Sequence, residues 1–587
     1  MLKDFLDVFK KELDKHGDKI ILDNYVLADG TYVIVKPSDL GFKIQSISEV
    51  KYNKKEKQLE STDMEVLDKL KEMDYNSCLV SMNKPIDIKK KIHSNNYLSF
   101  FLKKQVFLEK ALNNEIIDGY YNILENPHIK YAKDKRSKAL YENVEKQVGE
   151  VDTERLNKIR EWIKKNIFEL DVDKTRKDYL KIFFDFGIGE FEKEGKRYLI
   201  PNIYNKNDYN VEQNGEIYGL PNDNISLNSK KPYLENKTRG KKSGKDNYMV
   251  VPYLISDSEA ILQKKAFDYL MNFATKRKYN IFFDENTIIA QENGELLKGE
   301  FSGQFMRVEK GKTLDIASHD VISGYNFKLK NPFKMVNVLG CSENLLKNVE
   351  YGLKADKMKI QSLLDDVLFS KFLINNYFSD IKELKVKDNN LKINLEIARK
   401  SVFNWLYKND TSTIYTVLDK VSKRCIRSSI NNDYIPKACN QFNLRYSILN
   451  YFKESDNMAD ILVDIKKSLR EKINSKTTES FTSDLEYYFS IGQFVNYLAS
   501  KSKSAVKTQA FVNPFIDAKN NKIIKNKLGR LYRKYNYDIK NSEKRVRNMY
   551  AMISSYETDS KVNQDVIIAG YLHNNLIFEK EGEKVNG

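Results

Sequence analysis

The hydrophobic pattern of the chain changes at about residue 340, and this change constrains the fold more than any other feature. Before it, short extended runs rich in β-branched and aromatic residues, such as 31–35 and 42–47, alternate with amphipathic segments. From about Ser342 onward, apolar residues recur at the three- and four-residue spacing of a helix. The sequence therefore predicts a multidomain α+β protein, with an irregular mixed α/β amino-terminal region and an all-helical carboxyl-terminal region that ends in a helical bundle.

The amino-terminal region, residues 1–340, is expected to hold strands and helices in no regular alternation. Further strands are predicted at 181–186, 198–200, 281–283, 287–290 and 305–308, and helices near 155–170 and 258–276. This order does not fit a doubly wound parallel sheet. One polar stretch, 202–248, has almost no hydrophobic periodicity, and a loop of that length is typically functional or disordered.

The carboxyl-terminal half is predicted to consist of a helical middle region, 341–456, and a bundle, 457–587. Asp456 is expected to cap a helix whose apolar side begins with Met458, and Ser483 with Glu486 forms a capping-box pattern before the next helix. The remaining helices are predicted near 392–407, 412–427, 441–453, 518–535, 541–555 and 562–577.

A strongly basic segment lies inside the predicted bundle. Residues 501–547 contain fourteen Lys or Arg and three acidic residues, interleaved with Phe511, Phe515, Tyr532, Tyr535 and Tyr537. Cations neutralise phosphates and release counterions, while aromatic rings stack on unpaired bases. The pattern indicates a track for a nucleic-acid strand, for which the candidate residues are Lys501, Lys503, Lys507, Lys525, Arg530, Arg533 and Lys534. The alternative is a solvated basic face of a bundle.

A second candidate contact is the run from residue 89 to residue 101. It joins the cations Lys89, Lys90 and Lys91 to the amides Asn95 and Asn96, and then becomes apolar. Lysines can hold phosphates, and amides can contact base edges or backbone. The alternative is a loop whose Asn side chains cap the helix that follows.

Several kinds of chemistry have no signature in the sequence. The four cysteines are scattered, with no Cys-x-x-Cys pair and no histidine at zinc-ligand spacing. His319-Asp320 lacks companion ligands, and no Gly-x-x-x-x-Gly-Lys-Ser/Thr phosphate loop is present. The sequence therefore predicts no catalytic residues, no metal site and no cofactor.

The net charge of +17 predicts attraction to polyanions. The amino terminus lacks the hydrophobic run of a signal peptide, and no stretch of about eighteen uncharged apolar residues occurs. We therefore expect a cytoplasmic protein with no membrane partner.

Four motifs in a shared order resemble those of one family. They are the 89–101 run, the stretch 198–202 continuing to 206–209, the stretch 217–224 with 228–239, and Ile491-Gly492-Gln493 through 502–504 to the end of the pattern at 565–571. Together they span most of the chain. In this order they resemble the large subunit of type I-B CRISPR effector (Cascade) complexes, the Csh-type proteins.

The resemblance implies a non-catalytic subunit of an RNA-guided ribonucleoprotein for antiviral defence. Such a subunit recognises the protospacer-adjacent motif beside the target, supports R-loop formation and helps to recruit a helicase-nuclease that acts in trans. The implied partners are guide RNA, target DNA and the other effector-complex subunits, including the backbone and small subunits. Sequence choice then rests mainly on guide pairing, and the basic track of the bundle would hold the displaced single strand.

The resemblance also assigns roles to individual residues. The implied contacts to the flanking DNA are Asn222, Asn224, Asn228, Lys230, Lys231 and Tyr233. The alternative is a structural turn at 219–222 in which the Asn side chains stabilise the backbone. Arg239 joins the 89–96 run as a nucleic-acid backbone contact. The bundle is similar to the small subunit of the same complexes, and Met458 is the expected internal start for a separate small-subunit product. The alternative is that Met458 is a methionine of the core.

Two other functions remain compatible with the residues. One is a metal-dependent nucleic-acid phosphodiesterase whose ligands come together only in the fold. The other is a general basic RNA-binding scaffold, which binds without a guide and without preference for a flanking sequence.

Overall fold

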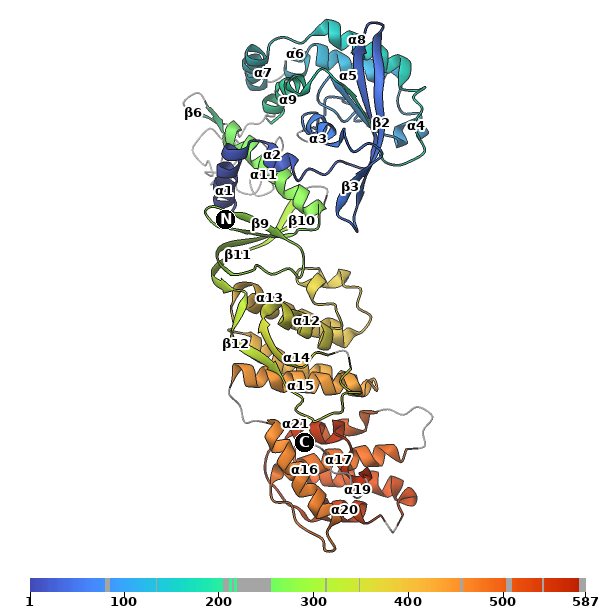
Figure 1. Cartoon of the computed structure of the whole chain (residues 1–587), viewed down its shortest axis with the longest axis vertical. Helices are drawn as coiled ribbons and strands as arrows, with labels where there is room; N and C mark the ends of the chain where they lie inside the picture. The colour runs from blue at the N-terminus through green and yellow to red at the C-terminus, as the bar shows by residue number, and fades with distance from the viewer. Residues whose placement is uncertain are drawn as a thin grey trace, which may run out of the picture. The chain divides into compact units, whose positions relative to one another are not determined.

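The computed structural model divides the chain into two compact units (Figure 1). The first unit comprises residues 1–292 and 303–321, and the second comprises residues 293–302 and 322–587. The residues that the structure describes are 1–79, 85–132, 135–203, 211–213, 216–218, 255–311, 314–347, 349–453, 458–502, 509–540 and 543–579.

A mixed five-stranded sheet forms the centre of the first unit, with strand order β3-β2-β1-β5-β4. β1 pairs antiparallel with β2 and parallel with β5, so the sheet is not doubly wound. Its strands are β1 (Gly30–Ser38), β2 (Gly41–Asn53), β3 (Gln58–Ser61), β4 (Ser99–Lys103) and β5 (Tyr179–Phe184). Apolar residues of these strands form one core with the helices that cover the sheet.

The helices of the first unit range in length from four to nineteen residues. They are α1 (Leu2–His16), α2 (Lys19–Leu22), α3 (Leu67–Tyr75), α4 (Gln105–Leu108), α5 (Asn114–Glu125), α6 (His128–Tyr131), α7 (Lys135–Val148), α8 (Thr153–Asn166), α9 (Ile188–Ile203) and α11 (Asp257–Thr275). Ser256 begins α11 with a capping box completed by Glu259, which satisfies two amide groups that the first turn would otherwise leave unpaired.

A second sheet, of order β11-β10-β8-β9, packs against α1 and α11. The ring of Phe5 in α1 lies 5.3 Å from that of Phe283, edge to face. The strands are β8 (Asn280–Phe283), β9 (Ile288–Gln291), β10 (Glu300–Lys310) and β11 (Leu314–Asn326), and a separate ribbon pairs β6 (Val211–Gln213) with β7 (Glu216–Tyr218).

The second unit is mainly helical. After the ribbon of β12 (Lys328–Met335) and β13 (Gly352–Asp356), the middle helices are α12 (Lys357–Val367), η1 (Ile374–Asn376), η2 (Ile381–Glu383), α13 (Asn389–Lys408), α14 (Ile414–Asn431) and α15 (Ile435–Phe452). The bundle follows with α16 (Met458–Asn474), α17 (Asp484–Ser500), η3 (Gln509–Val512), α18 (Asn513–Ile516), α19 (Asn521–Tyr535), η4 (Asn536–Asp538), α20 (Lys544–Ser555), α21 (Gln564–Leu572) and η5 (Leu576–Phe578).

These elements confirm the predicted α+β multidomain class. The three-region division at 340 and 456 stays a prediction, because one core joins side chains of α14 and α15 to those of the bundle. Ser483 caps α17 as predicted, accepting a hydrogen bond from the backbone N–H of Glu486 at 3.2 Å. The Glu486 carboxylate, however, accepts from the N–H of Thr482. Asp456 lies outside the described residues.

Two local predictions are wrong. The strand expected at 198–200 belongs to α9, because Phe191, Glu194 and Tyr198 are buried at helical spacing. The region after Ser342 is also not all helical, since β13 pairs antiparallel with β12. Five residues are too few for hydrophobic periodicity to identify such a strand.

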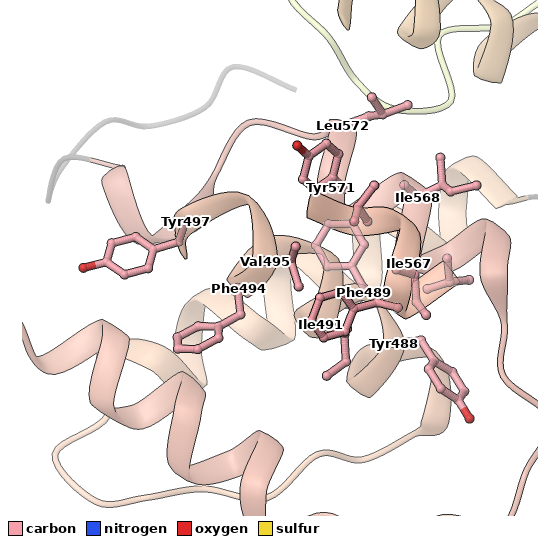
Figure 2. Close-up of a cluster of buried hydrophobic side chains, with 14 of the residues drawn as sticks. Tyr488, Phe489, Ile491, Phe494, Val495, Tyr497, Ile567, Ile568, Tyr571 and Leu572 are labelled. Atoms are coloured by element: carbon pink, nitrogen blue, oxygen red, sulfur yellow. The ribbon is translucent and has the colours of Figure 1, made fainter. Parts of the chain in front are cut away.

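The bundle is organised by a close crossing of α17 and α21 (Figure 2). A Cβ atom added at Gly492 would overlap the carbonyl oxygen of Ile567, and one added at Gly570 would overlap that of Phe489. Gln493 connects the same two helices, because its side-chain amide donates to the Gly570 carbonyl at 2.5 Å and accepts from the Leu576 N–H at 2.8 Å. The helices therefore meet backbone to backbone.

We expect Gly492→Ala and Gly570→Ala each to destabilise the second unit by at least about 3 kcal/mol, because backbone cannot yield to an added methyl group. Gly529→Ala, in α19, is the matched control. No atom lies within 4 Å of its Cβ position, and the exchange should stabilise the helix by about 0.5–1 kcal/mol. Urea unfolding followed by circular dichroism measures all three. Equal effects for the three variants would contradict the proposed crossing.

Candidate nucleic-acid interface

Helix α19 carries the basic segment that the sequence analysis identified. Asn520 begins it, because its side-chain oxygen accepts the N–H of Ile523 at 3.0 Å. Ile524, Leu528 and Tyr535 recur at helical spacing on the buried side. Because this side is fixed in the core, the opposite side faces solvent.

Four cations lie on that opposite side: Lys522, Arg530, Arg533 and Lys534, all exposed. At 100° per residue they fall within about 120° of the helix circumference, and they span about 18 Å along its axis. None of the four forms an ion pair with a residue that the structure describes. We call these four residues the α19 basic face. Sequence analysis missed Lys522, although its eight-residue spacing from Arg530 was a usable signal.

Two other cations of the predicted track are engaged inside the protein. Lys501 lies 3.7 Å from the Glu543 carboxylate and over the ring of Tyr497. Lys525 pairs with Glu557 at 2.6 Å. Lys503 and Lys507 lie outside the described residues. Of the predicted track, the structure therefore brings Arg530, Arg533 and Lys534 together on one face.

Most aromatic residues of the basic segment serve the core. Phe515 and Tyr535 are buried, Phe511 packs against the core, and the ring of Tyr532 stacks on that of Tyr550 at 3.9 Å. Tyr537, which follows α19, is 65% exposed. Stacking of bases on the other four rings is therefore not available in this structure, and contact by the α19 basic face is chiefly electrostatic.

The run at 89–96 forms a tight loop around one buried carboxylate. Asp87 accepts hydrogen bonds from the backbone N–H groups of Lys89 at 2.8 Å, Lys91 at 2.6 Å and Ile92 at 3.0 Å. Lys90 has a φ of 57°, in the left-handed region. The loop leaves the side chains of Lys89 and Lys90 exposed and that of Lys91 half-buried.

The amides of that run face inward. Asn95 and Asn96 are 3% and 0% exposed. Asn96 accepts the N–H of Leu98 at 3.0 Å and donates to the carbonyl of Phe191 at 3.0 Å. The amides therefore act within the fold, and only the lysines of this run can reach a nucleic-acid backbone. The capping alternative is wrong as well, because the strand β4 and not a helix follows these amides.

The residues assigned to DNA-flank recognition all lie outside the described part of the chain, and so does Arg239. The set is Asn222, Asn224, Asn228, Lys230, Lys231 and Tyr233. Of the polar stretch 202–248, the structure describes only the end of α9 at 202–203 and the ribbon of β6 and β7. These assignments stay predictions.

Met458, the predicted internal start, is the first residue of α16. Its side chain is half-buried and packs against the core of the second unit. Every helix of the bundle therefore lies after it in the chain.

His319 and Asp320 are consecutive exposed residues of β11, so their side chains point to opposite faces of the strand. Among the described residues, no group of three His, Cys, Asp or Glu side chains is placed to hold a metal ion. Within the same part of the chain, every helix is too short or too polar to span a bilayer.

No protein-family model, no curated protein and no solved structure matches this chain.

We expect the triple variant Arg530→Gln, Arg533→Gln and Lys534→Gln to bind single-stranded DNA more weakly than the native chain. Each cation that neutralises a phosphate contributes about 0.7 to the slope of log K against log salt concentration on a single strand. The slope should therefore decrease by about 2 in this variant. Fluorescence anisotropy with a labelled oligonucleotide at several salt concentrations measures both quantities.

The matched control removes the same charge from other elements of the second unit, through Lys467→Gln, Lys476→Gln and Lys561→Gln. These lysines are exposed, so both triple variants should keep native stability. If the control reduces affinity and slope as much as the α19 variant does, binding reflects total charge and not the α19 basic face.

Proposed function

We propose that this chain is a non-catalytic large subunit of a type I-B CRISPR RNA-guided surveillance complex. In this role it recognises the protospacer-adjacent motif, supports R-loop formation and helps to recruit a helicase-nuclease in antiviral defence. The observation that supports it most directly is the α19 basic face, in which four cations have no acidic partner among the described residues. Cations held on a helix without an acidic partner among the described residues suit sequence-independent contact with a strand.

The chemistry of this face fits the strand that guide pairing displaces. Such a strand has many sequences, so a protein that holds it must contact the backbone and not read base edges. Because most aromatic rings of the segment are buried, the attraction between this face and a strand comes mainly from contacts of its cations with phosphates. A general basic RNA-binding scaffold shares this chemistry, and it differs from our proposal in needing neither guide nor flank.

Copurification through a tag on this chain, expressed from its native locus, tests the proposal. We expect guide RNA and several effector subunits to elute with it, because the proposed role exists only within an assembly. The purified chain with labelled DNA and Mg²⁺ or Mn²⁺ should give no cleavage. Cleavage by the chain alone would establish the phosphodiesterase alternative, and binding of RNA without guide identity or companion subunits would establish the scaffold alternative.

We also expect a second, shorter product that begins at Met458. It would contain every helix of the bundle, but it would lack α15, whose Arg445 forms an ion pair with Asp565 of α21 at 3.0 Å. The surface that α15 covers in the full chain would then need a partner in the assembly. A carboxyl-terminal tag and immunoblotting should reveal a short band that remains with the complex.

Met458→Leu is the matched control for this expectation, because leucine preserves the volume and helix propensity at the start of α16 but cannot start translation efficiently. It should remove the short band and leave the full-length band. A short band that persists in the Met458→Leu variant would come from proteolysis. If the native strain gives no short band at all, the internal start is refuted.

A further inference from the structure

The first unit contains a cavity of about 580 Å³, a volume typical of small-ligand sites. The loop before β1, the strands β2, β4 and β5, and the helices α3 and α11 all contribute to its wall. Its ring-bearing side chains are Tyr25, Tyr52, Tyr75, His93, Phe101 and Tyr179. A wall so rich in rings favours a flat, aromatic ligand.

A buried ion pair stands in this wall. Lys181 donates a hydrogen bond to the carboxylate of Asp74, and their side chains are only 6% and 2% exposed. The hydroxyl of Tyr25 donates to the same carboxylate at 2.8 Å. Although burial opposes the charged form, the Asp74 carboxylate raises the pKa of Lys181. Lys181 therefore remains charged beside the cavity.

The surroundings of Lys181 hold its ammonium in place. It lies 4.6 Å from the ring of Phe101, 5.4 Å from that of Tyr32 and 5.5 Å from that of Tyr179. The ammonium of Lys181 has three N–H donors, and it donates one of them to the Asp74 carboxylate. An ion pair removed from water carries a large desolvation penalty, and such a pair in a cavity wall is typical of a binding site.

Three members of the cavity lining are exposed: the cations Lys54 and Lys310, and Asp29, whose carboxylate accepts the backbone N–H of Tyr52 at 2.8 Å. The ammonium of Lys310 donates to the hydroxyl of Thr275 at 2.7 Å. Partial burial and the like charge of Lys54 lower the pKa of Lys310. An anion beside Lys310 and Lys54 would offset the repulsion that lowers the pKa of Lys310.

His93 connects the wall of the cavity to the lysine loop at 89–91. One ring nitrogen of His93 lies 3.3 Å from the carbonyl oxygen of Lys90, and the other lies 3.4 Å from the hydroxyl of Tyr179. Burial lowers the pKa of His93, so the ring is neutral at pH 7. The lysine loop at 89–91 thus begins beside the cavity.

We infer that this cavity binds a single unpaired nucleotide. The base enters between the aromatic walls, the Asp74–Lys181 pair meets its polar edge, and the phosphate lies on Lys54 and Lys310. A carboxylate and an ammonium side by side match the adjacent donors and acceptors of a base edge, while rings stack on any base. This site goes beyond the proposed function, because it lies in the first unit and the α19 basic face lies in the second.

Isothermal titration calorimetry of the full chain tests the inference with AMP, GMP, CMP and UMP, with adenosine, and with inorganic phosphate. We expect the 5′-nucleotides to bind more tightly than adenosine, and phosphate alone to bind least. Phosphate that binds as tightly as the nucleotides would overturn the inference, because the site would then recognise only an anion.

Variants separate the parts of the site. Lys54→Gln with Lys310→Gln should lower nucleotide affinity roughly tenfold by removing the charged phosphate partners. Ala28→Phe should abolish binding, because Ala28 lines the cavity and the added ring fills it. Lys43→Gln with Lys51→Gln is the charge-matched control, since both lysines are exposed on β2 and neither lines the cavity.

Photo-crosslinking of the native chain with 4-thiouridine monophosphate gives a readout that does not depend on how the variants fold. Mass spectrometry should place the adducts on peptides that contain Tyr75, His93 or Tyr179. Adducts confined to the second unit would overturn the inference.

The triple α19 variant distinguishes failure of this inference from failure of the proposed function. Nucleotide binding that survives in that variant supports a separate site, whereas its loss there overturns the cavity assignment.

A second comparison identifies the source of the ligand. If a short oligonucleotide competes with AMP, and the same oligonucleotide with one abasic position competes less well, the cavity takes a nucleotide of a strand. Competition by free nucleotides alone identifies a free nucleotide as the ligand.

Discussion

The direct backbone contact between α17 and α21 is the constraint on which the bundle depends. Only glycine allows it at positions 492 and 570, and Gln493 then satisfies backbone groups at the end of α21. α17 is consequently buried on nearly all sides. It holds α19 through the hydrogen bond of Tyr487 to Asn521. The orientation of the α19 basic face is thus a consequence of how closely two other helices approach.

Helix geometry also decides which cations of the basic segment are available to a ligand. Lys525 lies at the edge of the buried side of α19, within reach of Glu557, and Lys501 at the end of α17 reaches Glu543. Arg530, five residues after Lys525, lies on the solvent side, where no described acid is within range. A high count of lysines in a segment therefore overstates its binding surface, because cations near the core are neutralised there.

Local patterns in the sequence predicted what depends on local physics. Long amphipathic helices such as α8, α11 and α19 were predicted close to their observed positions, whereas the short strand at 198–200 was assigned from three residues that a longer helical pattern contains. The motif at Ile491-Gly492-Gln493 was recognised without its structural reason. Contacts between residues distant in sequence could not be predicted. The sequence shows a single lysine, Lys181, in the apolar strand β5, but it does not show that Asp74 of α3 pairs with this lysine.

The two surfaces differ in the physics by which they would hold nucleic acid. Charges on the α19 basic face are surrounded by water, so dissolved ions screen their attraction within about 10 Å at 0.1 M salt. The Asp74–Lys181 pair lies in a wall from which water and ions are largely excluded, so its interactions depend on fit and direction. The α19 basic face would therefore hold a strand weakly along its backbone, whereas the cavity would hold a nucleotide strongly at one position. A nucleotide held there would fix the register of its own strand, which phosphate contacts alone cannot do because every phosphate is alike.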